Sequence, residues 1–201
     1  KRYRSQGACP FRSKCGKRSF CKHTASCLLC DQVSCMKCKL VKGNGANLLD
    51  FVENIQPWMI WLDFDRTICT TKNGSSPLHG RHSIDSDLLT LLTSFENVKI
   101  VTRNPHEEDI KTFLKRKGVP PTVPVYCVKQ QAKKSKAFVI QKFSSCKVQD
   151  VAESSAAEPQ GIHHIHGKCA EVIFVDDDIE ELIDPEVVDL DIIRFLYRRI
   201  K

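Results

Sequence analysis

The amino-acid sequence predicts an α/β fold in which a parallel β-sheet carries helices on both faces, preceded by a small cysteine-rich module. Three observations support this prediction. From about residue 46 onward, apolar runs of strand length alternate with segments of helical periodicity, the pattern of strand–helix–strand units. Seven of the 11 cysteines lie between Cys9 and Cys38. Residues 1–45 also hold 11 Lys and Arg against one Asp, whereas the remainder has a slight excess of acids.

The composition excludes several classes of protein. With 201 residues, 41% hydrophobic and 27% charged, the chain can bury a sizeable core and is unlike disordered, collagenous or coiled-coil sequences. Its longest apolar runs are strand-sized, far below the roughly 18–20 residues of a membrane helix, so we expect neither a membrane protein nor a membrane partner. The chain opens with Lys1 and without a signal-peptide pattern. We therefore expect it to be part of a longer polypeptide.

The first half of the expected sheet domain contains a hinge, two helices and two strands. Residues 42–47 (Lys-Gly-Asn-Gly-Ala-Asn) have the composition of a hinge, and a short helix follows and ends before Pro57. Residues 58–64 form an almost continuous apolar run that ends in acid, as expected of a strand buried on both faces. Ser83 is the expected N-cap of a leucine-rich helix, and residues 98–101 form the next buried strand.

The second half continues this alternation. Pro105 is expected to open a helix in its first turn, and Gly118 to close it. The remaining expected elements are strands over residues 123–128, 172–175 and 191–196 and helices over residues 135–143 and 179–183. Residues 146–169 interrupt the pattern as a flexible insertion. The alternating strands and helices together predict a Rossmann-like parallel sheet over residues 46–201, with the functional site at the carboxyl ends of its strands.

The basic module, residues 1–45, contains eight candidate zinc ligands. Two C-x2-C pairs separated by four residues are typical of a tetrahedral zinc site, because each tight turn brings two thiolates to one metal. A second group of four precedes them, so the set matches two structural zinc ions without remainder. The expected ligands are Cys9, Cys15, Cys21, His23, Cys27, Cys30, Cys35 and Cys38. Their pairing stays open between sequential and interleaved arrangements.

Other interpretations of the cysteines and histidines were weighed. A disulfide framework is disfavoured, because seven is an odd number and no secretory signal is visible. Zinc implies a reducing intracellular compartment, the cytoplasm or the nucleus, and would supply much of the module's folding energy. The basic charge suits contact with nucleic acid, although a purely structural or protein-binding module explains it nearly as well. For His163, His164, His166 and Cys169 we favour an exposed loop over a metal site.

Acidic and polar residues follow three of the expected strands. They occupy residues 63–67, 102–104 and 176–178. Because the carboxyl ends of parallel strands meet at one edge of a sheet, we expect these side chains to lie close together. Carboxylates gathered in this way are costly unless a cation neutralises them, and Mg²⁺ prefers such oxygen ligands. The pattern predicts a magnesium site at this edge.

With these motifs in this order, the sequence resembles the haloacid-dehalogenase-like (HAD) phosphatase superfamily. Residues 62–67 (Leu-Asp-Phe-Asp-Arg-Thr) match its D-x-D-x-T motif after a hydrophobic strand. Residues 101–104 (Val-Thr-Arg-Asn) match its second motif and residues 174–177 (Phe-Val-Asp-Asp) its acidic fourth motif. The resemblance covers roughly residues 57–200. D-x-D-x-T alone is a weak signal, whereas three motifs in order are specific.

The resemblance implies a Mg²⁺-dependent phosphomonoesterase that reacts through an aspartyl-phosphate. Asp63 would be the nucleophile, and Asp65 would protonate the leaving group and then activate water. Thr102 would hydrogen-bond the phosphoryl group, and Lys136 would neutralise its charge. Lys133 and Lys134 compete for the role of Lys136. The implied Mg²⁺ ligands are Asp63, the backbone carbonyl of Asp65, Asp176 and Asp177, with Asp178 or Glu181 as substitutes.

The resemblance also bears on the substrate. About 39 positions separate Asp63 from Thr102, which leaves no room for a folded cap domain. Capless family members have open sites, so we expect a phosphorylated macromolecule as partner, a nucleic-acid end slightly ahead of a phosphoprotein. The expected substrate-binding residues are Arg66, Thr67, Arg103 and Asn104. Two alternatives stay open: a zinc-dependent nucleic-acid- or protein-binding module on a catalytically idle HAD-like scaffold, and a small-molecule phosphatase whose zinc module serves assembly.

Overall fold

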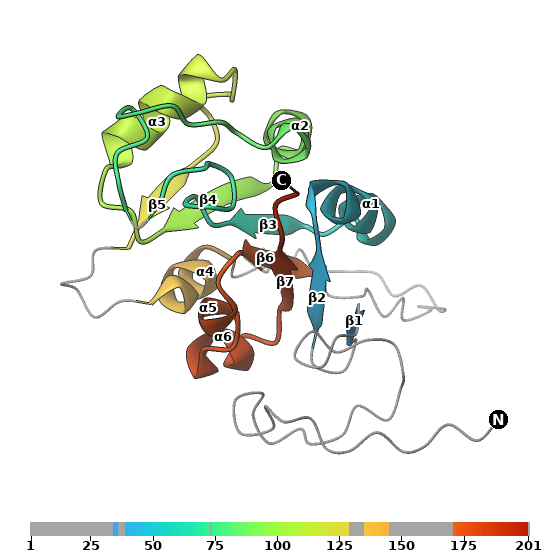
Figure 1. Ribbon diagram of the computed structural model, residues 1–201. Coiled ribbons are helices and arrows are strands. Elements are labelled where there is room, and N and C mark those ends of the chain that lie inside the picture. Colours follow the sequence, from blue (N-terminus) through green and yellow to red (C-terminus); the bar gives the residue numbers. More distant parts are fainter. Residues whose placement is uncertain (1–33, 36–38, 73, 129–134, 145–170, 201) are drawn as a thin grey trace, which may run out of the picture.

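Within the described part of the chain, one mixed sheet of seven strands has the order β1-β2-β7-β6-β3-β4-β5 (Figure 1). The computed structural model describes residues 34–35, 39–72, 74–128, 135–144 and 171–200. Six neighbouring strands, from β2 to β5 in that order, are parallel, and only the short edge strand β1 is antiparallel to its neighbour. The predicted α/β class with a parallel sheet is confirmed.

Strands and helices alternate along the chain. The strands are β1 (Ser34–Cys35), β2 (Leu40–Gly43), β3 (Met59–Leu62), β4 (Val98–Thr102), β5 (Val125–Cys127), β6 (Val172–Asp176) and β7 (Ile193–Tyr197). The helices are α1 (Gly45–Ile55), α2 (Ser86–Ser94), α3 (Glu107–Arg116), α4 (Lys136–Ser144), α5 (Ile179–Leu182) and α6 (Pro185–Asp189). All four residues of β3 are buried, as its continuous apolar run predicts. Within the described ranges, no helix has both the length and the apolar character that a membrane crossing needs.

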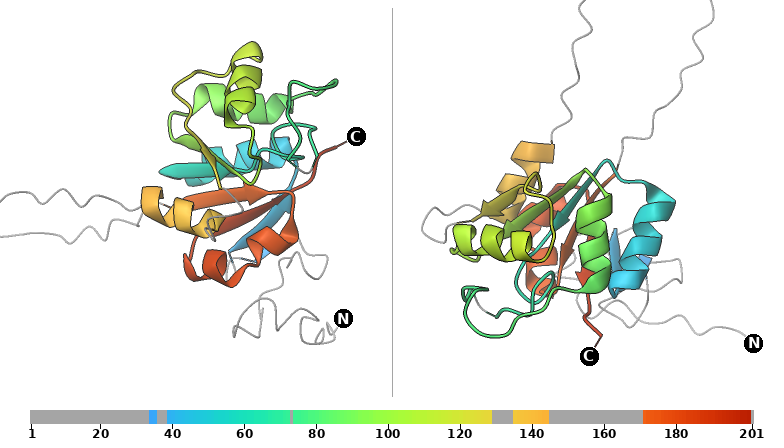
Figure 2. Two further views of the ribbon diagram at one scale, coloured as in Figure 1. Left: turned by 90° about the vertical axis from the view of Figure 1, so that its left-hand side faces the viewer. Right: turned by 90° about the horizontal axis from the view of Figure 1, so that it is seen from above.

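The helices cover both faces of the sheet and create two cores. Helices α1, α2 and α3 lie on one face, where Leu48, Leu88 and Phe113 belong to one buried apolar cluster. Helices α4, α5 and α6 lie on the other face, where Ile140 and Leu182 belong to a second cluster. Figure 2 shows the same two layers from the side and from above. The alternating side chains of each strand therefore contribute to both cores.

The hinge expected over residues 42–47 is wrong. Leu40–Gly43 form β2, which pairs in parallel with β7, so the sheet begins before the predicted boundary at residue 46. Asn44 then caps α1 through a reciprocal hydrogen-bond pair with Asn47. The glycines serve close packing, because a Cβ at Gly43 would lie 2.6 Å from the Asn47 Cβ and 2.9 Å from a Phe195 ring atom.

Two helix starts also differ from the prediction. Asp85, not Ser83, caps α2: its Oδ1 accepts hydrogen bonds from the backbone N–H groups of Asp87 (3.0 Å) and Leu88 (3.3 Å). Ser83 instead bonds to the preceding loop: its backbone N–H donates to the Thr70 hydroxyl, and its carbonyl oxygen accepts from Thr70 N. Helix α3 begins at Glu107, so Pro105 precedes the helix instead of opening its first turn. Helix α6 is an element that the sequence interpretation did not include.

The strand order reverses direction between β3 and β6. From β3 the chain moves outward through β4 to β5, and then returns to β6 on the opposite side of β3. The helices that follow β3 and β6, α2 and α5, lie on opposite faces of the sheet. This arrangement leaves the carboxyl ends of β3 and β6 uncovered by a crossing connection, which is where α/β folds place their sites.

Candidate active site

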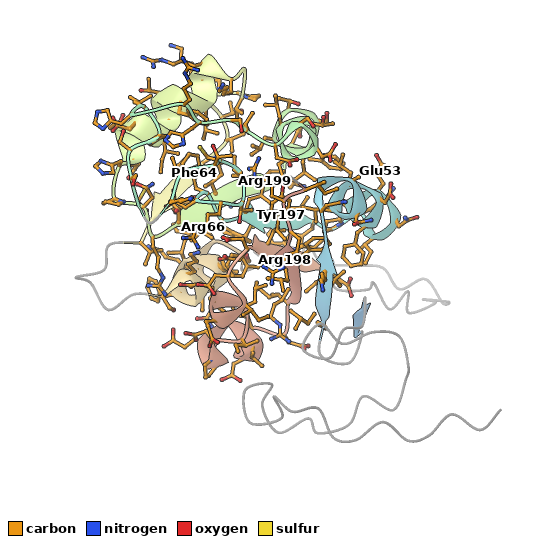
Figure 3. All side chains as sticks on the ribbon, in the orientation of Figure 1. Glu53, Phe64, Arg66, Tyr197, Arg198 and Arg199 are labelled. Atoms are coloured by element: carbon orange, nitrogen blue, oxygen red, sulfur yellow. The ribbon has the colours of Figure 1, made fainter. Side chains whose placement is uncertain are left out.

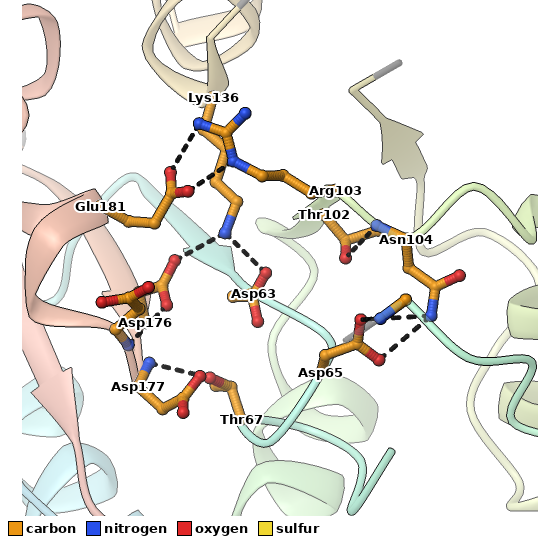
Figure 4. A network of polar contacts seen from close by, with 12 residues as sticks. Asp63, Asp65, Thr67, Thr102, Arg103, Asn104, Lys136, Asp176, Asp177 and Glu181 are labelled. Carbon is orange, nitrogen blue, oxygen red and sulfur yellow. Dashed lines mark hydrogen bonds and ion pairs between the residues drawn. The ribbon is translucent and has the colours of Figure 1, made fainter. Parts of the chain in front are cut away.

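Three aspartates from two neighbouring strands meet at this reversal point. Asp63 directly follows β3, Asp176 is the last residue of β6, and Asp177 comes next. Because Leu62 pairs with Val175, Asp63 and Asp176 occupy the next positions on adjacent strands. One carboxylate oxygen from each of the three residues lies within 4.8 Å of the other two. We call Asp63, Asp176 and Asp177 the acid cluster (Figure 4).

Lys136 binds two members of the acid cluster. It is the first residue of α4, and its Nζ donates to Asp63 Oδ1 and to Asp176 Oδ2, both at 2.7 Å. All three side chains are almost fully buried, with exposed fractions of 4%, 6% and 1% for Lys136, Asp63 and Asp176. The competing Lys133 and Lys134 lie outside the described residues. Lys136 therefore joins the start of α4 to the ends of β3 and β6.

The charges in this region do not balance. Burial raises the pKa of Asp63, and it raises the pKa of Asp176 to about 6, although the Lys136 ammonium opposes both shifts. Burial also raises the pKa of Asp177. For Lys136, burial favours the neutral amine, but the carboxylates of Asp63 and Asp176 outweigh it and raise its pKa. All three carboxylates in ionised form against one ammonium would give a net charge of −2. The raised pKa values show that burial disfavours this state, and a bound divalent cation would favour it.

The donor set of the acid cluster fits a hard cation. Carboxylate oxygens are the ligands that Mg²⁺ prefers, and Mg²⁺ usually takes only a few of them together with water or phosphate. Asp177 is half-buried, so the cluster is accessible from one side. The two substitutes considered from sequence have other partners: Asp178 Oδ1 caps α5 through Glu180 N (3.0 Å), and Glu181 forms an ion pair with Arg103. The structure thus groups Asp176 and Asp177, not their substitutes, with Asp63.

Asp65 belongs to a separate set of contacts. Its carboxylate is not part of the acid cluster. Instead it accepts hydrogen bonds from Asn104 Nδ2, at 3.1 Å and 3.2 Å to its two oxygens, and from Gly74 N at 3.0 Å. The two carboxylates of the first motif therefore have different surroundings. Asp63 contacts a buried ammonium, while Asp65 is held by neutral amides and is partly exposed.

Two threonines connect the strand ends. Thr102 ends β4, is 1% exposed, and its hydroxyl accepts a hydrogen bond from Asn104 N at 3.1 Å. A hydroxyl that accepts in this way keeps its own hydrogen for a further acceptor, such as a phosphoryl oxygen. Thr67 is fully buried, and its hydroxyl accepts from Asp177 N at 3.1 Å. It therefore positions Asp177, whereas the sequence interpretation places it among the substrate-binding residues.

The other predicted substrate-binding residues differ in their exposure. Arg66 is exposed in the turn after β3, and its charge opposes the burial-driven rise in the pKa of Asp177. Arg103 is also exposed and forms a two-pronged contact with Glu181, in which Nη2 lies 3.2 Å from Oε2 (Figure 4). Asn104 is fully buried, so it faces Asp65 and not the solvent. Among the predicted zinc ligands, only Cys35 lies within the described residues, where its backbone is part of β1.

The sequence interpretation missed a set of contacts from the end of the chain. Arg199 Nη2 donates to the carbonyl oxygens of Thr67 (2.8 Å) and Ile68 (3.0 Å), in the turn that carries the first motif. Tyr197 donates its hydroxyl to Asp85 Oδ2 at 2.6 Å, so the helix cap is also tied to β7. Figure 3 labels Tyr197 and Arg199, together with Phe64 and Arg66 of the first motif. No local sequence pattern predicts these contacts, because the partners are more than a hundred residues apart.

A cation-binding test follows from the unbalanced charge. Mg²⁺ should stabilise the protein against unfolding, by about 2–3 kcal/mol at a concentration a hundredfold above its Kd. Asp177→Asn removes one carboxylate without breaking the Lys136 contacts, so the Mg²⁺ affinity should fall about tenfold or more. Asp178→Asn is the matched control, because asparagine keeps the helix cap. Thermal unfolding across a Mg²⁺ titration measures both variants; equal affinities would contradict the assignment of Asp177.

Comparison with known proteins adds no family assignment. A scan against protein-family models, a search of curated proteins and a search of solved structures each found no match. The resemblance to HAD phosphatases therefore depends on the three motifs and on their placement at the ends of β3, β4 and β6.

Proposed function

We propose that the chain is a Mg²⁺-dependent phosphatase of the HAD-like type, reacting through an aspartyl-phosphate. The observation that carries this proposal is the position of Asp63. It lies buried at the reversal point of a parallel sheet, where the Lys136 ammonium bridges it to Asp176, with Thr102 at the end of the adjacent strand β4. Lys136 supplies one positive charge for three gathered carboxylates, so a further cation would favour their ionised forms.

The residues divide the chemistry between them. One Asp63 oxygen forms a bond to phosphorus while the bond from phosphorus to the ester oxygen breaks, and the Asp65 carboxyl group gives its proton to that oxygen. Asp65 then takes a proton from water, whose oxygen attacks phosphorus, so that inorganic phosphate leaves and Asp63 is restored. Lys136 uses two of its three N–H donors on Asp63 and Asp176. Its third N–H and the Thr102 hydroxyl can bind phosphoryl oxygens.

Magnesium would be held by the acid cluster. When bound, it would supply positive charge against the phosphoryl oxygens and so favour the developing charge of the transition state. The backbone carbonyl of Asp65 is the fourth ligand implied by the resemblance. Arg66 is exposed and its charge lowers the pKa of Asp177, so we propose that it meets further negative charge on the substrate.

The connections that follow β3 and β4 support a macromolecular substrate. In the described ranges, the chain between β3 and α2 is a loop with isolated bridges, and β4 is followed almost at once by α3. The described residues of these two connections form no folded cap domain. A phosphate on a nucleic-acid end or on a protein would have access to a site that no cap covers. We favour a nucleic-acid end, because residues 1–45 are strongly basic.

Hydrolysis of a simple ester tests the proposal. The protein with Mg²⁺ should hydrolyse p-nitrophenyl phosphate, and Asp63→Asn should reduce kcat by about a thousandfold or more, because the nucleophile is lost. Asp50→Asn, an exposed acid on α1, is the matched control and should keep full activity. Retained turnover in Asp63→Asn would refute the mechanism. No turnover of any ester by the parent protein, including 5′- and 3′-phosphorylated oligonucleotides and phosphopeptides, would favour an idle scaffold.

For the N-terminal module we propose two structural zinc ions. Their eight expected ligands are spaced as two groups of four in the sequence, and residues 1–38 include few large apolar residues. Metal analysis of the purified protein should give about two zinc ions per chain. Replacement of Cys27 and Cys30 by serine should lower this number by about one, because the two cysteines share one ion in both the sequential and the interleaved arrangement. A zinc-free protein with intact phosphatase activity would contradict the proposal.

A further inference from the structure

Asn104 is a fully buried polar residue whose side chain faces Asp65. Its Nδ2 lies 3.1 Å and 3.2 Å from the two carboxylate oxygens of Asp65 and 2.9 Å from the carbonyl oxygen of Ser75. Its Oδ1 accepts from His106 N at 3.0 Å. One N–H therefore bridges the carboxylate, and the other holds the loop. If the Asn104 amide were flipped, its Oδ1 would face the two Asp65 carboxylate oxygens and the Ser75 carbonyl oxygen, none of which can donate. Only the described orientation therefore satisfies the contacts.

The loop on the other side of Asp65 completes this arrangement. Gly74 N donates to Asp65 Oδ2 at 3.0 Å, and Gly74 adopts φ +72°, which favours glycine. A Cβ at Gly74 would lie 3.4 Å from Pro105 Cδ, so the loop packs against the turn that carries Asn104. The Asp65 carboxylate is therefore held from two segments that are distant in sequence. Neither segment contributes to the acid cluster.

We propose that Asn104 is a positioning residue for Asp65, the acid–base group of the proposed phosphatase, and that it does not contact the substrate itself. This inference rests on the proposed function. Asn104 keeps the Asp65 carboxyl group apart from the acid cluster and on the side where the leaving oxygen departs. Because Nδ2 reaches both oxygens, the carboxyl group can keep this hydrogen bond through one oxygen while the other transfers the proton.

Leaving-group dependence separates this role from general damage. Phenyl phosphate releases a phenol with a pKa of about 10, as in tyrosine, and needs a proton donor. 2,4-Dinitrophenyl phosphate releases a far more acidic phenol and needs none. Asn104→Ala and the isosteric Asn104→Asp should reduce kcat/KM for phenyl phosphate by about tenfold to a hundredfold. For the dinitrophenyl ester, kcat/KM should change less than about threefold. Because kcat/KM covers only the steps through ester cleavage, the later water attack does not blur the result.

Two further comparisons make the test decisive. Ser76→Ala removes a loop hydrogen bond to Asp109 Oδ2 (2.5 Å) that does not involve Asp65, and should leave the ratio of the two esters unchanged. In an Asp65→Ala background, Asn104→Ala should have no further effect on phenyl phosphate, since it acts through Asp65. Equal losses on both esters, or additive losses in the double variant, would overturn the inference while the parent enzyme stays active. A parent protein inactive on both esters would instead overturn the proposed function.

Discussion

The buried contact of the Lys136 ammonium with the carboxylates of Asp63 and Asp176 is the interaction on which the site depends. It joins the end of β3, the end of β6 and the start of α4 through two hydrogen bonds of 2.7 Å. Taking these charges out of water costs several kcal/mol per ion, and only close pairing offsets that cost. Removing one partner would leave an uncompensated buried charge. Burying this group of charges therefore costs folding free energy, and such costly groups are more typical of functional sites than of ordinary core packing.

The sheet topology gives the acidic residues their different environments. Asp63 and Asp176 are gathered because β3 and β6 are parallel neighbours at the point where the strand order reverses. Asp65, only two residues beyond Asp63, lies past a turn and is held by Asn104 and Gly74. The proposed phosphoryl transfer would need such a separation. The nucleophile requires positive charge nearby, whereas the acid–base group must stay outside the cation site and close to the leaving oxygen.

Much of this arrangement could be predicted from sequence, because it follows from local patterns. Apolar runs such as residues 59–62 identify buried strands, and the edge at which parallel strands end brings their following acids together. The remainder depends on contacts between distant segments. Gly43 suggests a hinge but is required by its close approach to Phe195, and Ser83 resembles a helix cap but is paired with the preceding loop. Likewise, nothing near Arg199 in sequence indicates that it holds the turn after β3.

The central claim is that Asp63 becomes covalently phosphorylated. Its most direct test is a rapid acid quench of the protein during turnover with Mg²⁺ and an aryl phosphate, followed by borohydride reduction and peptide mass spectrometry. An aspartyl-phosphate at Asp63 would be converted to homoserine at position 63, and this product should be absent without substrate. Turnover without modification of Asp63, or with the phosphoryl group on another residue, would contradict the account.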